Sequence, residues 1–243
     1  MKSQIHKSLL SAWLVSICIV VIPEIATGIE NFESLKVLDT VVPSYPLRMT
    51  YEGIYDGSAR VIINVDETGK LYDVYLESYT HPEFGRLAEE YIKRWTFQPA
   101  KLNGEPITVV KPIDFNFDDR RGVYALGIQE AVASKLNFSR HAKSKRVYDH
   151  DELDNGLEPI VMIQPLYPEE FKDTDIVGNA IVLFYVDETG TPRMSHLTDY
   201  SHRSFGQTAL MAIDTWRFKP PTVNGKPASI MVRQQFDFGK SKK

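Results

Sequence analysis

Apolar residues recur at every second position in the stretch just before residue 66. Val61, Ile63 and Val65 lie on one face and alternate with Arg60, Ile62 and Asn64 on the other. A period of two predicts a β-strand, and the Asp-Glu-Thr-Gly at 66–69 then supplies a turn that ends in a glycine suited to positive φ. A returning strand over 71–78 completes a predicted hairpin.

The apolar period changes to that of a helix after residue 80, where Thr80 and Glu83 have the spacing of a capping box. One helical face carries Phe84, Leu87, Ala88, Tyr91, Ile92 and Trp95. Asn103-Gly104 then predicts a tight turn into a last strand, whose buried face holds Ile107, Val109, Ile113, Phe115 and Phe117. The predicted unit is a three-stranded antiparallel sheet with an amphipathic helix packed on one face, an α+β fold.

The whole pattern occurs twice, at an offset of 121 residues. Val65-Asp66-Glu67-Thr68-Gly69 recurs unchanged at 186–190, and the offset also carries Trp95 onto Trp216. Further matched pairs are Gly57 and Gly178, His81 and His202, Phe84 and Phe205, Pro99 and Pro220, Asn103-Gly104 and Asn224-Gly225, and Phe117 and Phe238. A repeat of this length predicts two tandem homologous domains.

The domain boundaries follow from the repeat. We expect a signal peptide at 1–28, a first domain at 29–119, a linker at 120–156 and a second domain at 157–243. In the linker, Tyr124 to Leu136 has the pattern of a short helix, and a basic stretch is followed by an acidic one. Exposed ion pairs contribute at most about 1 kcal/mol, so these charges predict no function.

The N-terminus has the features of an export signal. Lys2 and Lys7 precede an apolar run from Leu9 to Ile22, and small residues follow at Ala26 and Gly28. The run is shorter than the roughly 20 apolar residues that span a bilayer, so cleavage and export are predicted, with an uncleaved membrane anchor as the alternative. Cys18 is the only cysteine, and because it lies inside this run the mature chain would have neither disulfides nor thiolate metal ligands.

Charge and motifs argue against several classes of function. The net charge of −4 with no basic domain makes nucleic acid an unexpected partner. His81 and His202 recur, but each lies beside a predicted helix start and has no second ligand at metal-binding spacing. Asp66 and Asp187 lie in turns, where aspartate is common. No catalytic motif is present, so we expect no enzyme activity, cofactor or metal.

Several motifs in order resemble the TonB C-terminal domain. In the second copy they are Gln164-Pro165-Leu166-Tyr167-Pro168, Gly178, the turn at 186–190, Trp216-Arg217-Phe218-Lys219-Pro220, Asn224-Gly225-Lys226-Pro227 and Phe236-Asp237-Phe238. The first copy carries Tyr45-Pro46, Trp95 and the same turns, but has Val42 where the motif has glutamine. A mid-membrane histidine and a proline-rich spacer, which full TonB proteins possess, are absent from the expected positions.

The resemblance implies a periplasmic, energy-transducer-like binding domain of the Gram-negative envelope that acts in transmembrane transport. Its expected partner is an extended segment, the TonB box of an outer-membrane transporter, or another envelope protein. The partner-binding residues that it implies are Gln164, Pro165, Tyr167, Pro168, Ile230, Val232, Arg233, Gln234 and Gln235. The alternative is a structural envelope protein that binds peptidoglycan or forms a homodimer, without energy transduction.

The last strands of the two copies differ as binding edges. Pro112 lies within the first, where it removes a backbone donor, whereas the aligned residue in the second is Arg233. We therefore predict that the second domain binds a partner strand and that the first is a spacer or docking domain. Ile181, Leu183 and Tyr185 make the outward face of another strand apolar, which predicts packing against the other domain or a second molecule.

Overall fold

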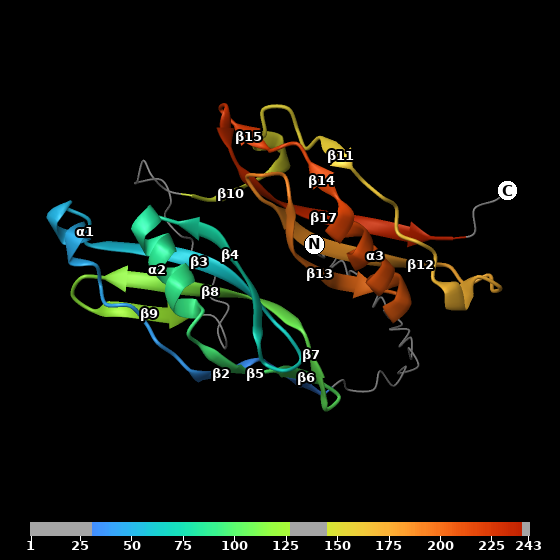
Figure 1. The fold of residues 1–243 in the computed structure, drawn as a ribbon, viewed down its shortest axis with the longest axis horizontal. Helices are drawn as coiled ribbons and strands as arrows, with labels where there is room; N and C mark the ends of the chain where they lie inside the picture. Colours follow the sequence, from blue (N-terminus) through green and yellow to red (C-terminus); the bar gives the residue numbers. More distant parts are fainter. Residues whose placement is uncertain (1–30, 127–144, 240–243) are drawn as a thin grey trace, which may run out of the picture. The chain divides into compact units, whose positions relative to one another are not determined.

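The structure is a computed structural model that describes residues 31–126 and 145–239 (Figure 1). All of these residues belong to one compact unit. The predicted signal peptide and most of the predicted linker helix lie outside the described residues. Repeat 1 denotes residues 31–126 and repeat 2 denotes residues 145–239.

Repeat 1 contains two helices and nine strands. In chain order they are β1 (Phe32–Glu33), β2 (Lys36–Asp39), α1 (Leu47–Tyr51), β3 (Asp56–Val65), β4 (Leu71–Tyr79), α2 (Pro82–Ile92), β5 (Thr96–Gln98), β6 (Ala100–Leu102), β7 (Glu105–Ile107), β8 (Val109–Asp118) and β9 (Gly122–Leu126). Its central sheet has the order β4-β3-β8-β9, and β2 pairs separately with β5.

Repeat 2 has the same central plan. Its elements are β10 (Val147–Tyr148), the 3-10 helix η2 (His150–Glu152), β11 (Pro159–Val161), the 3-10 helix η3 (Glu169–Phe171), β12 (Gly178–Val186), β13 (Pro192–Tyr200), α3 (Arg203–Thr215), β14 (Arg217–Phe218), β15 (Thr222–Val223), β16 (Lys226–Pro227) and β17 (Ser229–Phe238). The central sheet has the order β10-β17-β12-β13. The predicted α+β fold in two tandem copies is confirmed.

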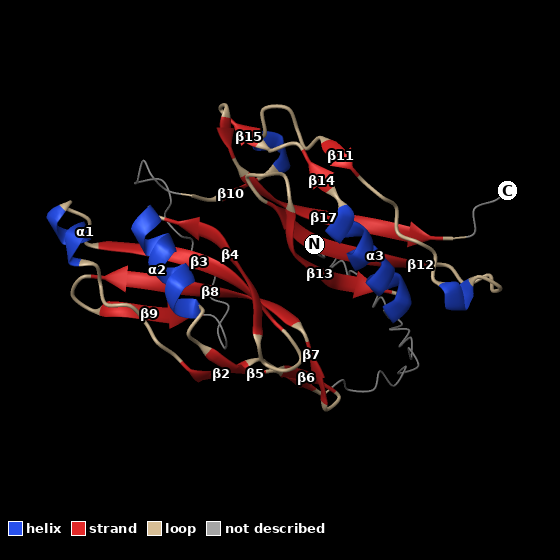
Figure 2. Cartoon of the chain, viewed as in Figure 1, coloured by secondary structure: helices blue, strands red, loops and turns tan. Residues whose placement is uncertain are grey.

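One helix covers one face of each sheet, α2 in repeat 1 and α3 in repeat 2 (Figure 2). The predicted apolar stripes form the contacts, since Phe84 stacks on Phe117 at 4.5 Å between ring centroids and Phe205 stacks on Phe238 at 4.7 Å. Trp95 and Trp216 are buried as predicted. The helix-facing sides of both sheets therefore hold two equivalent hydrophobic cores.

The start of α2 differs from the capping box predicted from Thr80 and Glu83, and α3 starts in the same way as α2. His81 and His202 are the N-cap residues, and their Nδ1 atoms accept hydrogen bonds from the backbone N–H of Glu83 (3.2 Å) and Ser204 (3.3 Å). The hydroxyl of Thr80 instead accepts a hydrogen bond from the Ser58 N–H at 2.9 Å. Because an imidazole nitrogen can satisfy a free helix N–H, both histidines have a structural role.

The predicted turns are confirmed in both copies. Asp66 Oδ1 accepts hydrogen bonds from the backbone N–H groups of Thr68 and Lys70, and Asp187 Oδ1 does the same for Thr189 and Thr191. The Thr68 hydroxyl also donates to Asp66, and this set of bonds lowers the pKa of that carboxyl. These aspartates therefore stabilise hairpins.

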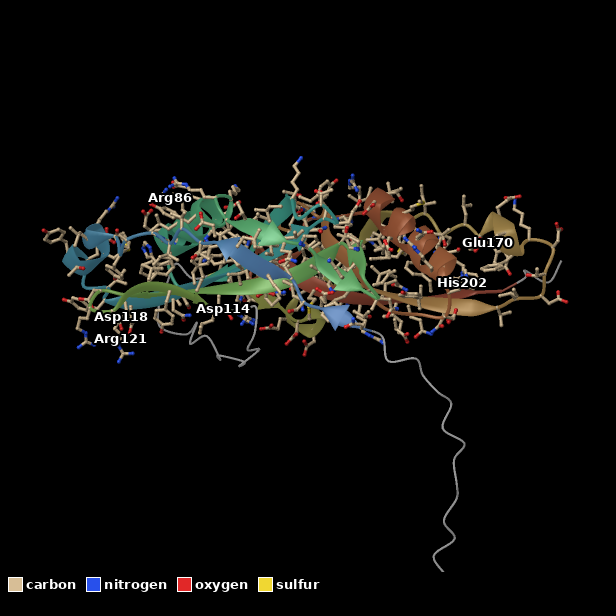
Figure 3. The ribbon with its side chains drawn as sticks, turned by 90° about the horizontal axis from the view of Figure 1, so that it is seen from below. Arg86, Asp114, Asp118, Arg121, Glu170 and His202 are labelled. Carbon is tan, nitrogen blue, oxygen red and sulfur yellow. The ribbon has the colours of Figure 1, made fainter. Side chains whose placement is uncertain are left out.

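Each central sheet has a fourth strand that the sequence analysis did not predict. β9 pairs antiparallel with β8, and β10 pairs parallel with the start of β17. Tyr124–Leu126 are thus part of a strand, and the prediction of a helix is wrong for these three residues. The physical reason is a tight turn, in which Asp118 accepts hydrogen bonds from the N–H groups of Arg120 and Arg121 and Gly122 has a φ of 83°. Asp118 and Arg121 mark this turn in Figure 3.

Candidate functional site

The outer edge of β17 is open over most of its length. On one side β17 pairs with β12 from Gly178↔Phe238 to Val186↔Ile230. On the other side β10 pairs only with Ser229 and Ile230. Among the described residues, no strand pairs with the outer edge over 231–238. A row of unpaired backbone groups is a template for an added strand.

The equivalent edge of repeat 1 is closed over its second half. β9 pairs with residues 114–118 of β8, and the repeat offset carries these positions onto 235–239 (Figure 1). Pro112 lies just before the closed part and pairs with Ile62, as the aligned Arg233 pairs with Leu183. The two repeats therefore share a fold but differ in the availability of this edge.

Two adjoining hollows follow the open edge of β17. The first has a volume of about 360 Å³ and is lined by His150, Leu157, Pro159, Met162, Trp216, Phe218, Ile230, Met231, Val232, Arg233 and Gln234. The second has a volume of about 430 Å³ and is lined by Met162, Gln164, Pro165, Trp216, Gln234, Gln235, Phe236, Asp237 and Phe238. Met162, Trp216 and Gln234 border both, so the hollows form a continuous groove, here called the β17 groove.

Seven of the nine predicted binding residues border the β17 groove. Gln164, Pro165, Gln234 and Gln235 line its second hollow, whereas Ile230, Val232, Arg233 and Gln234 line the first. Ile230 is fully buried and its backbone already pairs with Tyr148, so it belongs to the floor of the groove. The structure thus brings together residues from the motif at 164–168 and from the last strand.

The other two predicted residues, Tyr167 and Pro168, lie outside the groove. The Tyr167 hydroxyl donates a hydrogen bond to the carbonyl of Ile176, and its ring contacts Phe205 at 5.9 Å. Pro168 is buried. Tyr45 makes the same type of bond to Ile54 in repeat 1, so this tyrosine fixes the loop before the sheet in both copies. A role for Tyr167 and Pro168 in partner binding stays a prediction.

The sequence analysis missed an exposed apolar run at 160–163, of which Met162 borders both hollows of the β17 groove. Residues 160–163 read Ile-Val-Met-Ile and are all exposed, with Ile160 62% and Ile163 55% accessible, and Met231 across the groove is 50% accessible. A run of four apolar residues just before Gln164 is the signal that would have revealed it. Exposed apolar residues next to unpaired backbone groups are typical of a protein-binding surface.

Comparison with known proteins agrees with this fold. The sequence model of the family described as Gram-negative bacterial TonB protein C-terminal matches residues 41–118 and 163–239, one match in each repeat. The chain belongs to this family. No curated protein matches the sequence.

Two solved TonB structures are similar to parts of the chain. The solution structure of the Pseudomonas aeruginosa TonB C-terminal domain is 26% identical, covers 36% of this chain and 89% of its own, and has a TM-score of 0.33. The TonB2 protein from Vibrio anguillarum is 24% identical, covers 34% of this chain and 82% of its own, and has a TM-score of 0.28.

The described parts of the two TonB C-terminal domains contain neither a metal-binding cluster nor a membrane-spanning helix. Within residues 31–126 and 145–239, no group of three or more His, Cys, Asp and Glu side chains is placed to hold a metal ion. In the same ranges no helix is both long and apolar enough to cross a membrane.

The two TonB C-terminal domains contact each other through the sheet faces that the helices leave bare. Ile62 and Tyr75 of the first pack with Tyr185 and Met194 of the second, and the Tyr75 and Tyr185 rings lie 5.0 Å apart. The sequence analysis predicted an apolar outward face on this strand, β12, and its residue Tyr185 packs against the other domain. Burial raises the pKa of the Tyr75 hydroxyl and of the Tyr185 hydroxyl.

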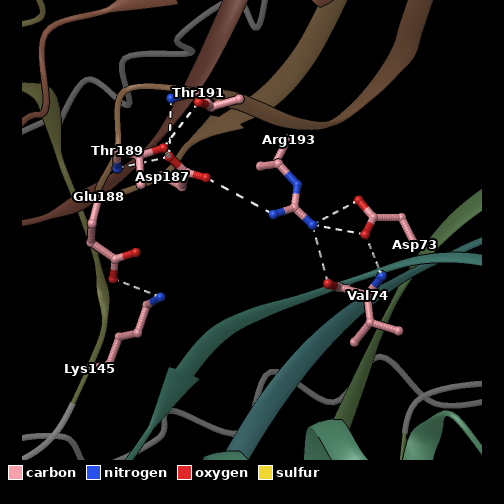
Figure 4. A network of polar contacts seen from close by, with 8 residues as sticks. All are labelled: Asp73, Val74, Lys145, Asp187, Glu188, Thr189, Thr191 and Arg193. Carbon is pink, nitrogen blue, oxygen red and sulfur yellow. Dashed lines mark hydrogen bonds and ion pairs between the residues drawn. The ribbon is translucent and has the colours of Figure 1, made fainter.

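Polar contacts accompany this apolar contact, and Figure 4 shows the network around Arg193. Arg193 Nη2 lies 2.8 and 2.9 Å from the two carboxylate oxygens of Asp73, and Lys145 Nζ lies 2.7 Å from Glu188. The Tyr185 hydroxyl donates to Glu77 Oε1 at 2.7 Å. Burial raises the pKa of Glu77 despite the nearby Arg60. The Arg193–Asp73 and Tyr185–Glu77 contacts join the two domains, whereas Lys145 and Glu188 both belong to repeat 2.

Proposed function

We propose that the second TonB C-terminal domain captures an extended segment of an outer-membrane transporter, or of another envelope protein, by strand addition to β17. The observation that carries this proposal is the open edge over 231–238 beside an apolar groove. Backbone hydrogen bonds to an added strand give affinity, and the groove gives side-chain selectivity. The protein thereby supports transmembrane transport from the periplasm without catalysis.

The first TonB C-terminal domain has a supporting role in this proposal. Its edge is covered by β9 at residues 114–118 and contains Pro112 just before them, so it offers fewer backbone groups to a partner. Its other sheet face contacts the second domain through Tyr75 and Asp73. It therefore acts as a docking domain that holds the binding domain in place.

The test uses Arg233→Pro, with Arg233→Ala as the matched control. Repeat 1 already has proline at the aligned position 112, paired with Ile62, so proline at 233 is compatible with the sheet. Both variants lose the guanidinium, but only the proline removes the N–H of residue 233. Synthetic peptides with TonB-box sequences are titrated into the protein, and circular dichroism verifies the fold of each variant.

We expect saturable binding that Arg233→Pro weakens at least about tenfold relative to Arg233→Ala, because one strand-addition hydrogen bond and the pairing around it are lost. Equal affinities of the two variants would exclude pairing through the N–H of residue 233. Absence of peptide binding to the unchanged protein would contradict the proposal as a whole.

Self-association is a second candidate because the exposed run 160–163 and the open edge suit a second copy of the chain as well. Self-association would make this a structural protein of the cell envelope. Such a protein could also bind peptidoglycan, which is therefore tested as well. Sedimentation equilibrium distinguishes the candidates. A dimer that forms with increasing protein concentration, and that the Arg233→Pro variant does not form, favours self-association. Co-sedimentation with isolated sacculi tests peptidoglycan in the same preparation.

A further inference from the structure

Strand β9 shows what an added strand looks like on this type of edge. It pairs antiparallel with β8 in the register Asp114↔Leu126, Phe115↔Ala125 and Phe117↔Val123. The repeat offset carries Phe115 and Phe117 onto Phe236 and Phe238, which form the open end of β17. Repeat 1 therefore contains, within its own chain, an occupant of the position that is open in repeat 2.

The two faces of β9 have different environments. Val123 and Ala125 are half-buried and pack against the core beneath α2. Tyr124 and Leu126 point away from this core and are 44% and 51% exposed. Occupation of this edge thus selects small aliphatic side chains at alternate positions and sets no limit on side-chain size at the positions between them.

The corresponding space in repeat 2 is hollow. Phe236 and Phe238 border the second hollow of the β17 groove together with Pro165 and Trp216. Their exposures are 5% and 6%, whereas Phe115 and Phe117, which β9 covers, are 0% and 1% exposed. Repeat 2 thus lacks, among the described residues, the aliphatic contacts that Val123 and Ala125 provide in repeat 1.

We infer that the occupant of the β17 groove is an extended partner segment that runs antiparallel to β17 and carries Val- or Ala-sized side chains opposite Phe236 and Phe238. This inference rests on the proposed strand addition and specifies its ligand. The intervening residue lies opposite Asp237, which is exposed, so an acidic side chain is disfavoured there by like-charge repulsion.

The experiment uses an end-capped synthetic peptide with the sequence of residues 121–127 and the full chain. Two peptide variants form a matched pair, Ala125→Asp on the inward face and Leu126→Asp on the outward face. Both add one negative charge, but only the first places it against the phenylalanines. Titration gives the affinities, and amide hydrogen exchange of the protein shows which strand the peptide protects.

We expect the unchanged peptide to slow exchange at 235–238 in β17. Ala125→Asp should weaken binding at least about tenfold and Leu126→Asp less than about threefold, because an unpaired charge is disfavoured only where it is buried. Equal loss with both variants, or protection outside β17, would overturn the inference. If TonB-box peptides protect β17 and this peptide does not, the inference fails while the proposed function stands. If neither binds, both fail.

Discussion

Glu77 is a buried carboxylate at the contact between the two domains, and its environment predicts a pH dependence of stability. It accepts a hydrogen bond from the Tyr185 hydroxyl, and Arg60 Nε lies 3.7 Å from its other oxygen. Burial nevertheless raises its pKa above the ordinary value of 4.5. Folding therefore favours the protonated form, and this stabilisation is present below about pH 4.5 and lost as the pH rises through the raised folded pKa.

Glu77→Gln keeps an acceptor for the Tyr185 hydroxyl but cannot ionise. The unfolding free energy of the original protein minus that of the variant should decrease as the pH is raised from about 4 to about 7. Urea unfolding of both proteins at several pH values measures this difference, in which all other titrating groups cancel. A difference that stays constant with pH would show that folding leaves the pKa of Glu77 unchanged.

At the scale of elements, the β12–β13 turn is fixed by a contact that only glycine permits. Gly190 has a φ of 83°, and a Cβ there would lie 2.0 Å from the carbonyl oxygen of Phe218. Gly225 has a φ of 70°, but a Cβ at that position would enter open space, with no neighbouring atom within 4 Å. The first turn packs against β14, as the Phe218 N–H donates to the Gly190 carbonyl at 2.9 Å.

Gly225→Ala should therefore lower the unfolding free energy by about 1 kcal/mol, the cost of the left-handed conformation alone. Gly190→Ala should lower it by at least about 3 kcal/mol, because the strands must also move apart. Chemical denaturation of the two variants tests this, and equal losses would indicate that the turn relaxes freely.

The elements also show which structure a single sequence can predict. The residues at 61–65 repeat with the period of a strand, and the stripe from Phe84 to Trp95 repeats with the period of a helix. Each pattern lies within one continuous segment, so both elements were predicted correctly. β9 has five residues and β10 has two, and their positions depend on strands distant in sequence, which leaves little local signal. The prediction from Pro112 and Arg233 that the second domain binds a partner strand stays a prediction, since the strand that covers residues 114–118 of the first edge is β9.

The candidate site was predictable only in part for a similar reason. A motif gives the residues but not which way their side chains point. Gln164 and Pro165 border the groove, whereas Tyr167, three residues after Gln164, contacts Phe205 and the Ile176 carbonyl. The equivalent Tyr45 in repeat 1 would have suggested a structural role, because it is kept in the copy that lacks the glutamine.

At the scale of the whole molecule, the described domains are joined asymmetrically. Tyr185 contributes its ring and hydroxyl to the contact, but the residue aligned with it in repeat 1 is Asn64. Lys145 pairs through its backbone with Tyr79 of repeat 1, and two residues later Val147 pairs with Ser229 of β17. The segment 145–148 thus connects the domain contact directly to the start of β17, before its open edge.

This connection predicts that the domains unfold together and that Tyr185 maintains the coupling. Tyr185→Ala removes a ring that is 6% exposed and leaves Glu77 without its hydroxyl donor, so we expect a loss of about 3 kcal/mol and two separate unfolding transitions. Tyr72→Ala is the matched control, because Tyr72 is 76% exposed on β4 and its loss should change stability by less than about 0.5 kcal/mol.

Denaturation and amide hydrogen exchange together distinguish coupling from a general loss of stability. If the contact couples the domains, Tyr185→Ala should speed exchange at Ser229 and Ile230, where β10 covers the edge, while the core around Phe184 keeps its protection. A single transition with unchanged exchange at these two amides would mean that Tyr185 does not maintain the coupling. Two transitions already in the unchanged protein would mean that the domains are stable independently. The first domain would then serve only as a spacer.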